Sequence, residues 1–181
     1  MDSKRKIERH TWAGNAPGTW QSCAENLLGA AAVLRRQRLL QGPEPVQLPA
    51  GCLLQPPELM LSGMAVECLC KALWLKRDGT LAKDGKFIGV PAVGMGGHDL
   101  VTLSTVVGLD MSDAERDCLQ RLSQFIVYGG RYPIPKNAED LRMTKRPGGG
   151  ESESTSWNSP GDQCLLDGLL ARLNHHLSGS A

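Results

Sequence analysis

Residues 57–77 read Pro-Glu-Leu-Met-Leu-Ser-Gly-Met-Ala-Val-Glu-Cys-Leu-Cys-Lys-Ala-Leu-Trp-Leu-Lys-Arg, and this segment carries the strongest structural signal in the chain. Apolar residues occupy nearly every side of the helix that it predicts, and Pro57 suits a first helical turn. A helix with almost no polar face belongs in the centre of a bundle, so we expect 59–76 to be its most buried segment. Glu67 and Lys71 interrupt the stretch, which makes it too short and too charged to span a membrane.

The composition of the whole chain favours helices over strands. Its 181 residues include 26 Leu against 13 Ile plus Val, and aromatic residues make up only 4%. Leucine favours helices, whereas strands prefer β-branched and aromatic residues. The net charge of +1 excludes a strongly basic protein that coats nucleic acid and an acidic tail protein, so any contact with nucleic acid must come from a local patch.

Four further helices are predicted from apolar spacing, capping residues and stop signals. They cover residues 20–42, 99–107, 113–128 and 162–177. Thr19, Asp99 and Ser112 are the expected N-caps, and Ser112 also forms a capping box with Glu115, three residues later. The last helix carries a stripe of leucines that should face the core. Together with the central helix they predict one all-α domain, an up-and-down antiparallel bundle of about five helices over residues 19–177.

The segments between these helices are expected to be irregular. Residues 1–18 are interpreted as a flexible leader, and residues 43–57, with five prolines, as a loop. Residues 79–97 are rich in Gly and Lys, and residues 144–161 form a low-complexity linker before the last helix. No alternation of apolar and polar residues is long enough to predict a strand.

The six cysteines do not have the spacing of a zinc or redox motif, because no Cys-x-x-Cys pair occurs. Most of them lie in apolar runs, where cysteine behaves as a small hydrophobic residue. Residues 1–10 are polar and basic and lack the apolar core of a signal peptide. We therefore expect reduced cysteines and a cytoplasmic protein.

Glu67 and Lys71 are the first candidate site residues, because they lie four apart in the most apolar helix. Glu before Lys at this spacing is the favourable order for an ion pair, and buried charges are costly unless paired. One interpretation is a structural pair that fixes the register of the bundle. The other is that Glu67 faces a polar cavity or a second subunit.

His98 is the second candidate, at the start of a predicted helix. If Asp99 is simply the N-cap, His98 needs only a hydrogen bond to a neighbouring carbonyl. The alternative is a functional histidine, since an imidazole titrates near neutral pH.

Arg131 and Tyr132 are the third candidates, between Gly129-Gly130 and a Pro-x-Pro turn. Residues 131–146 contain five basic and two acidic side chains, Lys136 among the basic ones. Such a segment could contact phosphates, with Tyr132 stacking on a base. The alternatives are a solvated basic loop and an arginine that caps the carbonyls at the end of the preceding helix.

Three of these stretches, in this order, resemble motifs of the HEPN-domain family. The run Leu61–Leu73, with Glu67-Cys68-Leu69-Cys70-Lys71-Ala72-Leu73 at its end, looks like the second helix of HEPN domains. Gly97-His98-Asp99-Leu100 looks like the segment before the family's short third helix. Arg131-Tyr132-Pro133 looks like the segment that follows its fourth helix. The resemblance covers about residues 19–177.

The resemblance implies a helical bundle that is often dimeric. HEPN proteins include metal-independent ribonucleases of toxin–antitoxin and phage-defence systems, as well as non-catalytic modules that bind nucleotides or RNA. The catalytic members carry Arg-x(4–6)-His near the fourth helix, but Lys136, Asn137 and Ala138 stand where that histidine would fall after Arg131. A formal match, Arg5-x4-His10, lies in the leader outside the predicted bundle.

The sequence thus predicts a nucleotide- or RNA-binding module of a bacterial-type defence, toxin–antitoxin or RNA-processing system. Its expected ligand residues are Arg131, Tyr132, His98 and Lys136, around a cavity shaped by Glu67 and Lys71. No catalytic residue, cofactor or metal is assigned. The expected partners are a nucleotide or RNA, a cognate antitoxin or nucleotidyltransferase, and a second copy of the chain.

Two alternatives remain open. The chain could be a divergent metal-independent ribonuclease in which His98 or Tyr132 replaces the missing histidine. It could also be a non-catalytic structural partner protein.

Overall fold

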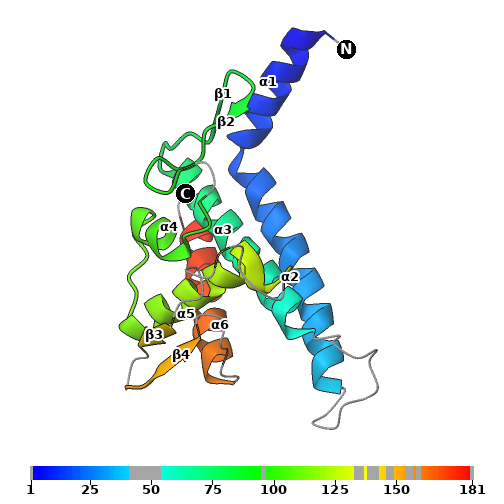
Figure 1. Ribbon diagram of the computed structural model, residues 1–181. Helices are drawn as coiled ribbons and strands as arrows, with labels where there is room; N and C mark the ends of the chain where they lie inside the picture. The colour runs from blue at the N-terminus through cyan, green and yellow to red at the C-terminus, as the bar shows by residue number, and fades with distance from the viewer. Residues whose placement is uncertain are drawn as a thin grey trace.

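The computed structural model describes residues 2–40, 54–94, 97–132, 137, 143–145, 149–153, 157 and 160–179. This part of the chain is mostly helical, as the composition predicts, with two small antiparallel hairpins (Figure 1). The helices are α1 (Ser3–Gly14), α2 (Pro17–Leu40), α3 (Gln55–Lys76), α4 (Leu100–Val106), α5 (Asp113–Gln124), the π-helical turn η1 (Phe125–Gly129) and α6 (Gly161–Ser178). The strands are β1 (Ala82–Lys83), β2 (Lys86–Phe87), β3 (Met143–Lys145) and β4 (Glu151–Glu153).

Helix α3 is the centre of the molecule, as predicted. Fourteen of its 22 residues are buried, and α2, α4, α5, η1 and α6 all contact it. It begins at Gln55, two residues before the predicted start, so both Pro56 and Pro57 lie in its first turn. Prolines fit there because the first amides of a helix have no intrahelical acceptor.

Helix α2 runs antiparallel beside α3 and is longer than predicted. It begins at Pro17 rather than after Thr19, so the expected N-cap at Thr19 is wrong. Ala24 and Ala31 are fully covered, and Trp20 packs against the core from the same face. Small residues at these positions let the two long helices approach closely.

The three later helices follow their sequence signals closely. The Asp99 carboxylate accepts a hydrogen bond from Thr102 N at the start of α4. Ser112 and Glu115 form the predicted capping box of α5. The predicted stripe of α6 is buried, and it consists of Leu166, Leu169, Leu173 and Leu177.

Helix α5 continues into η1, which packs tightly on α3 because of two glycines. A Cβ at Gly63 would lie 2.9 Å from Ile126 Cγ1, and a Cβ at Gly130 would lie 2.3 Å from Met60 Cβ. Larger residues at either position would push η1 away from α3. The sequence predicted this helix to stop at Gly129-Gly130, and it does, although its last turn is π-helical.

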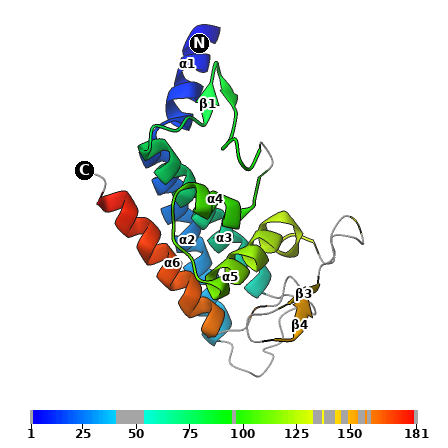
Figure 2. The same ribbon diagram turned by 90° about the vertical axis from the view of Figure 1, so that its left-hand side faces the viewer.

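The expectation of a flexible leader over 1–18 is wrong for the described residues, because 3–14 form α1. This helix stands above the bundle, and the hairpin β1–β2 lies beside it (Figures 1 and 2). The Asn15 side chain accepts from Leu81 N and Ala82 N and donates to Ala82 O, which joins the end of α1 to β1. The hairpin also replaces part of the irregular segment expected over 79–97.

The linker expected over 144–161 contains part of a second hairpin. Thr144 pairs with Ser152 in β3–β4, and Gly149 and Gly150, both with positive φ, lie between the strands. Trp157 packs edge-on against Phe125, with ring centroids 6.5 Å apart. The expectation of an irregular linker is therefore wrong for the residues that form β3 and β4. Most of the predicted loop over 43–57 lies outside the described residues.

Candidate ligand site around His98

One buried carboxylate joins two basic side chains in the centre of the bundle. Glu67 lies on α3 with only 8% of its surface exposed. Its Oε1 pairs with Nζ of Lys71, one helical turn later, and its Oε2 lies 2.8 Å from Nδ1 of His98. The predicted Glu67–Lys71 pair is therefore present and buried. The structure adds His98 to it, although His98 is 31 residues away in the sequence.

The start of α4 holds His98 in this position. Asp99 caps the helix, as expected, and Leu100 N donates to Ser123 Oγ of α5 at 3.1 Å. These two hydrogen bonds fix the backbone on the carboxyl side of His98. Asp99 as N-cap was the simpler of the two interpretations, but the His98 ring bonds to Glu67 rather than to a neighbouring carbonyl.

Two aromatic rings enclose the ammonium group of Lys71. Its Nζ lies 4.9 Å from the Trp20 ring centroid and 5.1 Å from that of Phe87. The Trp20 indole is itself held by a hydrogen bond to Gly14 O at 2.9 Å. A cation over aromatic faces is attracted by their quadrupoles, most strongly where water is excluded. Lys71 is thus anchored by Glu67 and by residues of α2 and β2.

The contact with Glu67 also determines what the other nitrogen of His98 can do. A carboxylate can only accept hydrogen bonds, so the proton of a neutral imidazole belongs on Nδ1. Nε2 is then an acceptor, and it becomes a donor when the ring is protonated. Nε2 makes no hydrogen bond to the described residues, and 38% of the side chain is exposed.

His98 lines two cavities. The smaller, of about 170 Å³, lies on the side of Glu67 and Lys71 and is otherwise mostly apolar. The larger, of about 420 Å³, lies between the start of α4 and the α5–η1 segment. Gln120 and Gln124 line the larger cavity together with Ser123. Amide side chains donate and accept at once, so this wall can pair with a polar, uncharged group.

Arg131 has the capping contacts that one of the alternatives predicts. Its Nη2 donates to Ile126 O at 2.8 Å and to Val127 O at 3.0 Å. Its Nε and Nη1 make no hydrogen bond to the described residues. The guanidinium carbon lies 5.8 Å from the Tyr132 ring centroid, and Tyr132 is 57% exposed. Lys136, the fourth expected ligand residue, lies outside the described residues.

The wall of the larger cavity on this side is formed by α5 and η1, and Arg131 follows them in the sequence. Gln120 and Gln124 lie four apart on α5 and Val127 lies in the π-helical turn η1, whereas Arg131 lies beyond the end of η1 at Gly129. The first three of them line the cavity with His98. The structure therefore brings Glu67, Lys71 and His98 into direct contact. Arg131 and Tyr132 follow η1, and neither makes a hydrogen bond or ion pair with His98.

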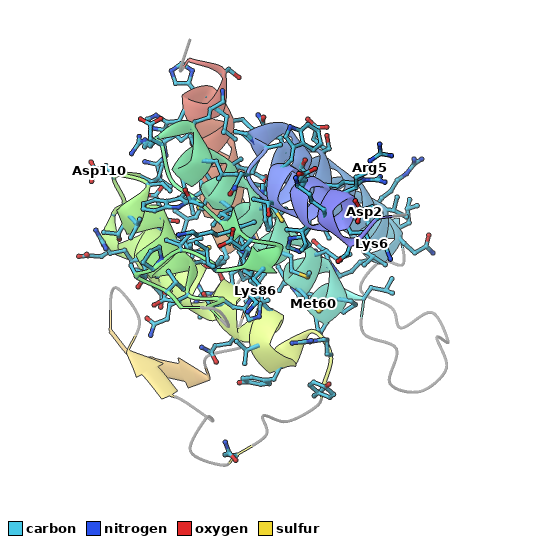
Figure 3. All side chains as sticks on the ribbon, turned by 90° about the horizontal axis from the view of Figure 1, so that it is seen from above. Asp2, Arg5, Lys6, Met60, Lys86 and Asp110 are labelled. Carbon is cyan, nitrogen blue, oxygen red and sulfur yellow. The ribbon has the colours of Figure 1, made fainter. Side chains whose placement is uncertain are left out.

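Four residues of this region were not predicted as site residues. Gln120 and Gln124 carry a signal that could have been used, because two amides four apart on a helix share a face. Trp20 and Phe87 were not identified as neighbours of Lys71, and no local signal points to them. Arg5 and His10, the formal Arg-x4-His match, are both exposed on α1, and Figure 3 shows Arg5 on the outer side of that helix.

Comparison with known proteins gives no relative: no protein-family model matches the chain, and no curated protein or solved structure is similar to it. The resemblance to HEPN domains therefore stays a prediction that rests on the three motifs. In the described part of the chain, no helix is long and apolar enough to cross a membrane. The described residues also contain no group of three or more His, Cys, Asp or Glu side chains that could hold a metal ion.

Proposed function

We propose that this chain is a HEPN-like helical module that binds a nucleotide or RNA in the larger cavity beside His98. The observation that carries the proposal is the state of the His98 ring. Glu67 orients it through Nδ1, and its Nε2 makes no hydrogen bond to the described residues beside a cavity of about 420 Å³. A ring that is held on one side and open on the other can bind a ligand without first being ordered.

The chemistry of the cavity wall fits a base or a ribose better than it fits a bare anion. Gln120 and Gln124 offer paired donors and acceptors, which match the edge of a nucleobase. A protonated His98 would add a donor for a ribose hydroxyl or a phosphate oxygen. The uncommitted nitrogens of Arg131 would supply the phosphate contact, and the exposed Tyr132 ring a stacking surface.

The setting that we propose for this module is a bacterial-type defence, toxin–antitoxin or RNA-processing system in the cytoplasm. The HEPN-like motifs support it, and with them the proposed partners: a cognate antitoxin or nucleotidyltransferase and a second copy of the chain. None of the five cysteines in the described part of the chain is in a disulfide, which suits a reducing compartment.

Titration calorimetry with ATP, GTP and a short single-stranded RNA at low salt tests the proposal. Arg131→Ala should weaken RNA binding and lower the dependence of log Kd on log salt by about one phosphate contact. Arg9→Ala is the matched control, because it removes the same charge from α1, which stands apart from this cavity. Wild-type protein that binds none of the three ligands would contradict the proposal.

A second function is favoured by the same histidine, namely metal-independent cleavage of RNA. An imidazole held by a carboxylate through Nδ1, with Nε2 open, has the arrangement of a general base. His98 would then take the proton of a ribose 2′-hydroxyl, whose oxygen attacks the adjacent phosphate. The bond from phosphorus to the 5′-oxygen of the next nucleotide breaks, which leaves a 2′,3′-cyclic phosphate on one fragment and, once the 5′-oxygen takes up a proton, a 5′-hydroxyl on the other. Cleavage of a generic RNA in EDTA that disappears in His98→Asn would favour this function over binding alone.

A further inference from the structure

The two long helices α2 and α3 meet in an ordered series of side-chain contacts. Trp20 lies over Lys71, Cys23 contacts Cys68, and near the other end Arg38 binds Glu58. The residue numbers rise on one helix as they fall on the other, as expected for antiparallel neighbours. Cys23 and Cys68 thus form one of these contacts between the helices, one helical turn from the contact between Trp20 and Lys71.

The geometry of this cysteine pair is close to that of a disulfide. The two Sγ atoms are 3.8 Å apart, whereas a disulfide needs about 2.05 Å, so they must approach by roughly 1.8 Å. Both side chains come from helices that are already packed together, so the approach needs side-chain rotation and a small shift. We propose that Cys23 and Cys68 are a thiol–disulfide site, at which oxidation by a small-molecule disulfide links α2 to α3.

The exposure of the two thiols sets the order of the chemical steps. Cys23 is exposed and Cys68 is buried, so only Cys23 can be reached by an external disulfide such as oxidised glutathione. The Cys23 thiolate attacks one glutathione sulfur, and the S–S bond of the oxidant breaks and releases one reduced glutathione. The Cys68 thiolate then attacks Cys23 Sγ and releases the second. The two thiols lose two electrons and two protons, which end on the two molecules of reduced glutathione.

The second step should be the slow one. Burial is the largest cause that raises the pKa of Cys68, to about 12 while Cys23 is a free thiol, and burial still raises this pKa once glutathione occupies Cys23. Only the thiolate is nucleophilic, so below that pKa the rate of ring closure should rise about tenfold for each unit of pH. Intermediates with glutathione on Cys23 should therefore accumulate near neutral pH and convert to the internal disulfide at higher pH.

The experiment is oxidation of the full chain in a series of oxidised and reduced glutathione mixtures, with thiols then blocked in acid. We expect a product two hydrogen masses lighter than the reduced chain, with fragmentation placing the bond between Cys23 and Cys68. The product should be absent in Cys23→Ser and Cys68→Ala. It should persist in Cys164→Ser, which removes the other exposed cysteine of the described residues, and in Cys52→Ser.

Two results would overturn the proposal. One is a Cys23–glutathione adduct that does not convert to the internal disulfide as the pH rises. The other is an internal disulfide that survives in Cys68→Ala, which would place the bond on a different cysteine. Since Cys68 is buried, circular dichroism of Cys68→Ala must show native helix content. If it does not, the test rests on whether the wild-type Cys23–glutathione adduct converts to the internal disulfide, and on the pH dependence of that conversion.

Discussion

Two of the clusters of buried charge in the described part of the chain differ in whether one of their side chains lines a cavity. In the first, Arg121 of α5 is 1% exposed and binds Asp162 at the start of α6 through two hydrogen bonds of 2.7 and 2.8 Å. Asp117, one turn earlier, accepts from Nε at 3.0 Å, and Trp157 lies over the guanidinium. In the second, Glu67 binds Lys71 and His98.

The first cluster is closed, and the second opens onto a cavity. The guanidinium of Arg121 is enclosed by two carboxylates and a ring, so it has a structural role in joining α5 to α6. His98, by contrast, is 38% exposed and makes one hydrogen bond to the described residues, through one ring nitrogen only. Buried charge by itself therefore does not indicate a functional site. The difference lies in His98, a partly exposed ring that lines a cavity and whose Nε2 makes no hydrogen bond to the described residues.

The largest effect is expected from breaking the closed cluster. Arg121→Met should lower the free energy of unfolding by about 3–5 kcal/mol, because it removes the positive charge that pairs with the buried carboxylate of Asp162 and the partly buried carboxylate of Asp117. Burial opposes the charge of Arg121, but Asp162 and Asp117 outweigh it and raise the pKa of the guanidinium above its ordinary value. The arginine is therefore charged at every pH of the experiment. Urea denaturation at neutral pH measures the loss.

A matched variant separates lost charge pairing from lost packing. Arg121→Met combined with Asp162→Asn and Asp117→Asn should recover much of the stability, because the carboxylates no longer carry charge. If the triple variant is no more stable than Arg121→Met, packing rather than charge holds α5 to α6.

The open cluster should respond less strongly. We expect Glu67→Ala to cost about 3 kcal/mol, since it leaves the buried ammonium of Lys71 without its counter-ion. Trp20 and Phe87 retain their contact with Lys71, and this should limit the loss. The double variant Glu67→Ala with Lys71→Met should recover part of the stability that Glu67→Ala loses. Identical denaturation curves for Glu67→Ala and the wild type would contradict the burial of the pair.

The local elements of the fold could be predicted from the sequence because their signals are local. Helix α3 is apolar on nearly every side, the buried leucines of α6 repeat at helical spacing, and the caps at Asp99 and Ser112 depend on residues within one turn. The Glu67–Lys71 pair was predicted for the same reason, since its members are four residues apart. All of these interactions are decided within a few residues of the chain.

The remainder depends on contacts between distant parts of the chain. Helix α1 is polar along much of its length, so its apolar spacing is weak, and hydrogen bonds from Asn15 to the hairpin 67 residues away support its end. The contact of His98 with Glu67 likewise spans 31 residues. No local pattern encodes such pairs. The sequence therefore identified His98, Glu67 and Lys71 as candidate residues, but it did not predict the contact between His98 and Glu67.

The ion pair of Glu115 with the partly exposed Arg172 provides the small end of the comparison. Partial burial opposes ionisation of Glu115, but hydrogen bonds from Ser112 and the pairing with Arg172 outweigh it, so the pKa of Glu115 lies below its ordinary value. A carboxyl group with a lowered pKa stabilises the fold above its unfolded pKa, and this contribution disappears as the pH falls. Arg172→Ala should cost about 0.5–1 kcal/mol at pH 7, because Arg172 is 41% exposed.

Urea denaturation of Arg172→Ala and wild type between pH 2 and pH 7 measures this effect. The difference in the free energy of unfolding should shrink as the pH falls and Glu115 takes up a proton, and the part that remains belongs to the hydrogen bond from Arg172 Nη1 to Asp110 O. Arg116→Ala is the control, because Arg116 is exposed on α5, the helix that carries Glu115. A difference that stays constant over this range would assign the effect to packing of the arginine stem.

The smallest effect on stability, and the sharpest test of the open cluster, is expected at His98. Asparagine can place an amide near the position of Nδ1, so His98→Asn keeps a donor for Glu67 but removes Nε2. Glutamine can place its amide near the position of Nε2, so His98→Gln keeps a polar group at the cavity but weakens the contact with Glu67.

We expect His98→Asn to change the free energy of unfolding by less than about 1 kcal/mol, because the side chain is partly exposed. It should nevertheless lose the proposed binding of RNA or a nucleotide, measured by calorimetry on the same preparation as the wild type. His98→Gln should show the reverse order, with the larger loss of stability and the smaller loss of affinity. If both variants lose stability and affinity in parallel, His98 acts only through Glu67, and the second cluster is as closed as the first.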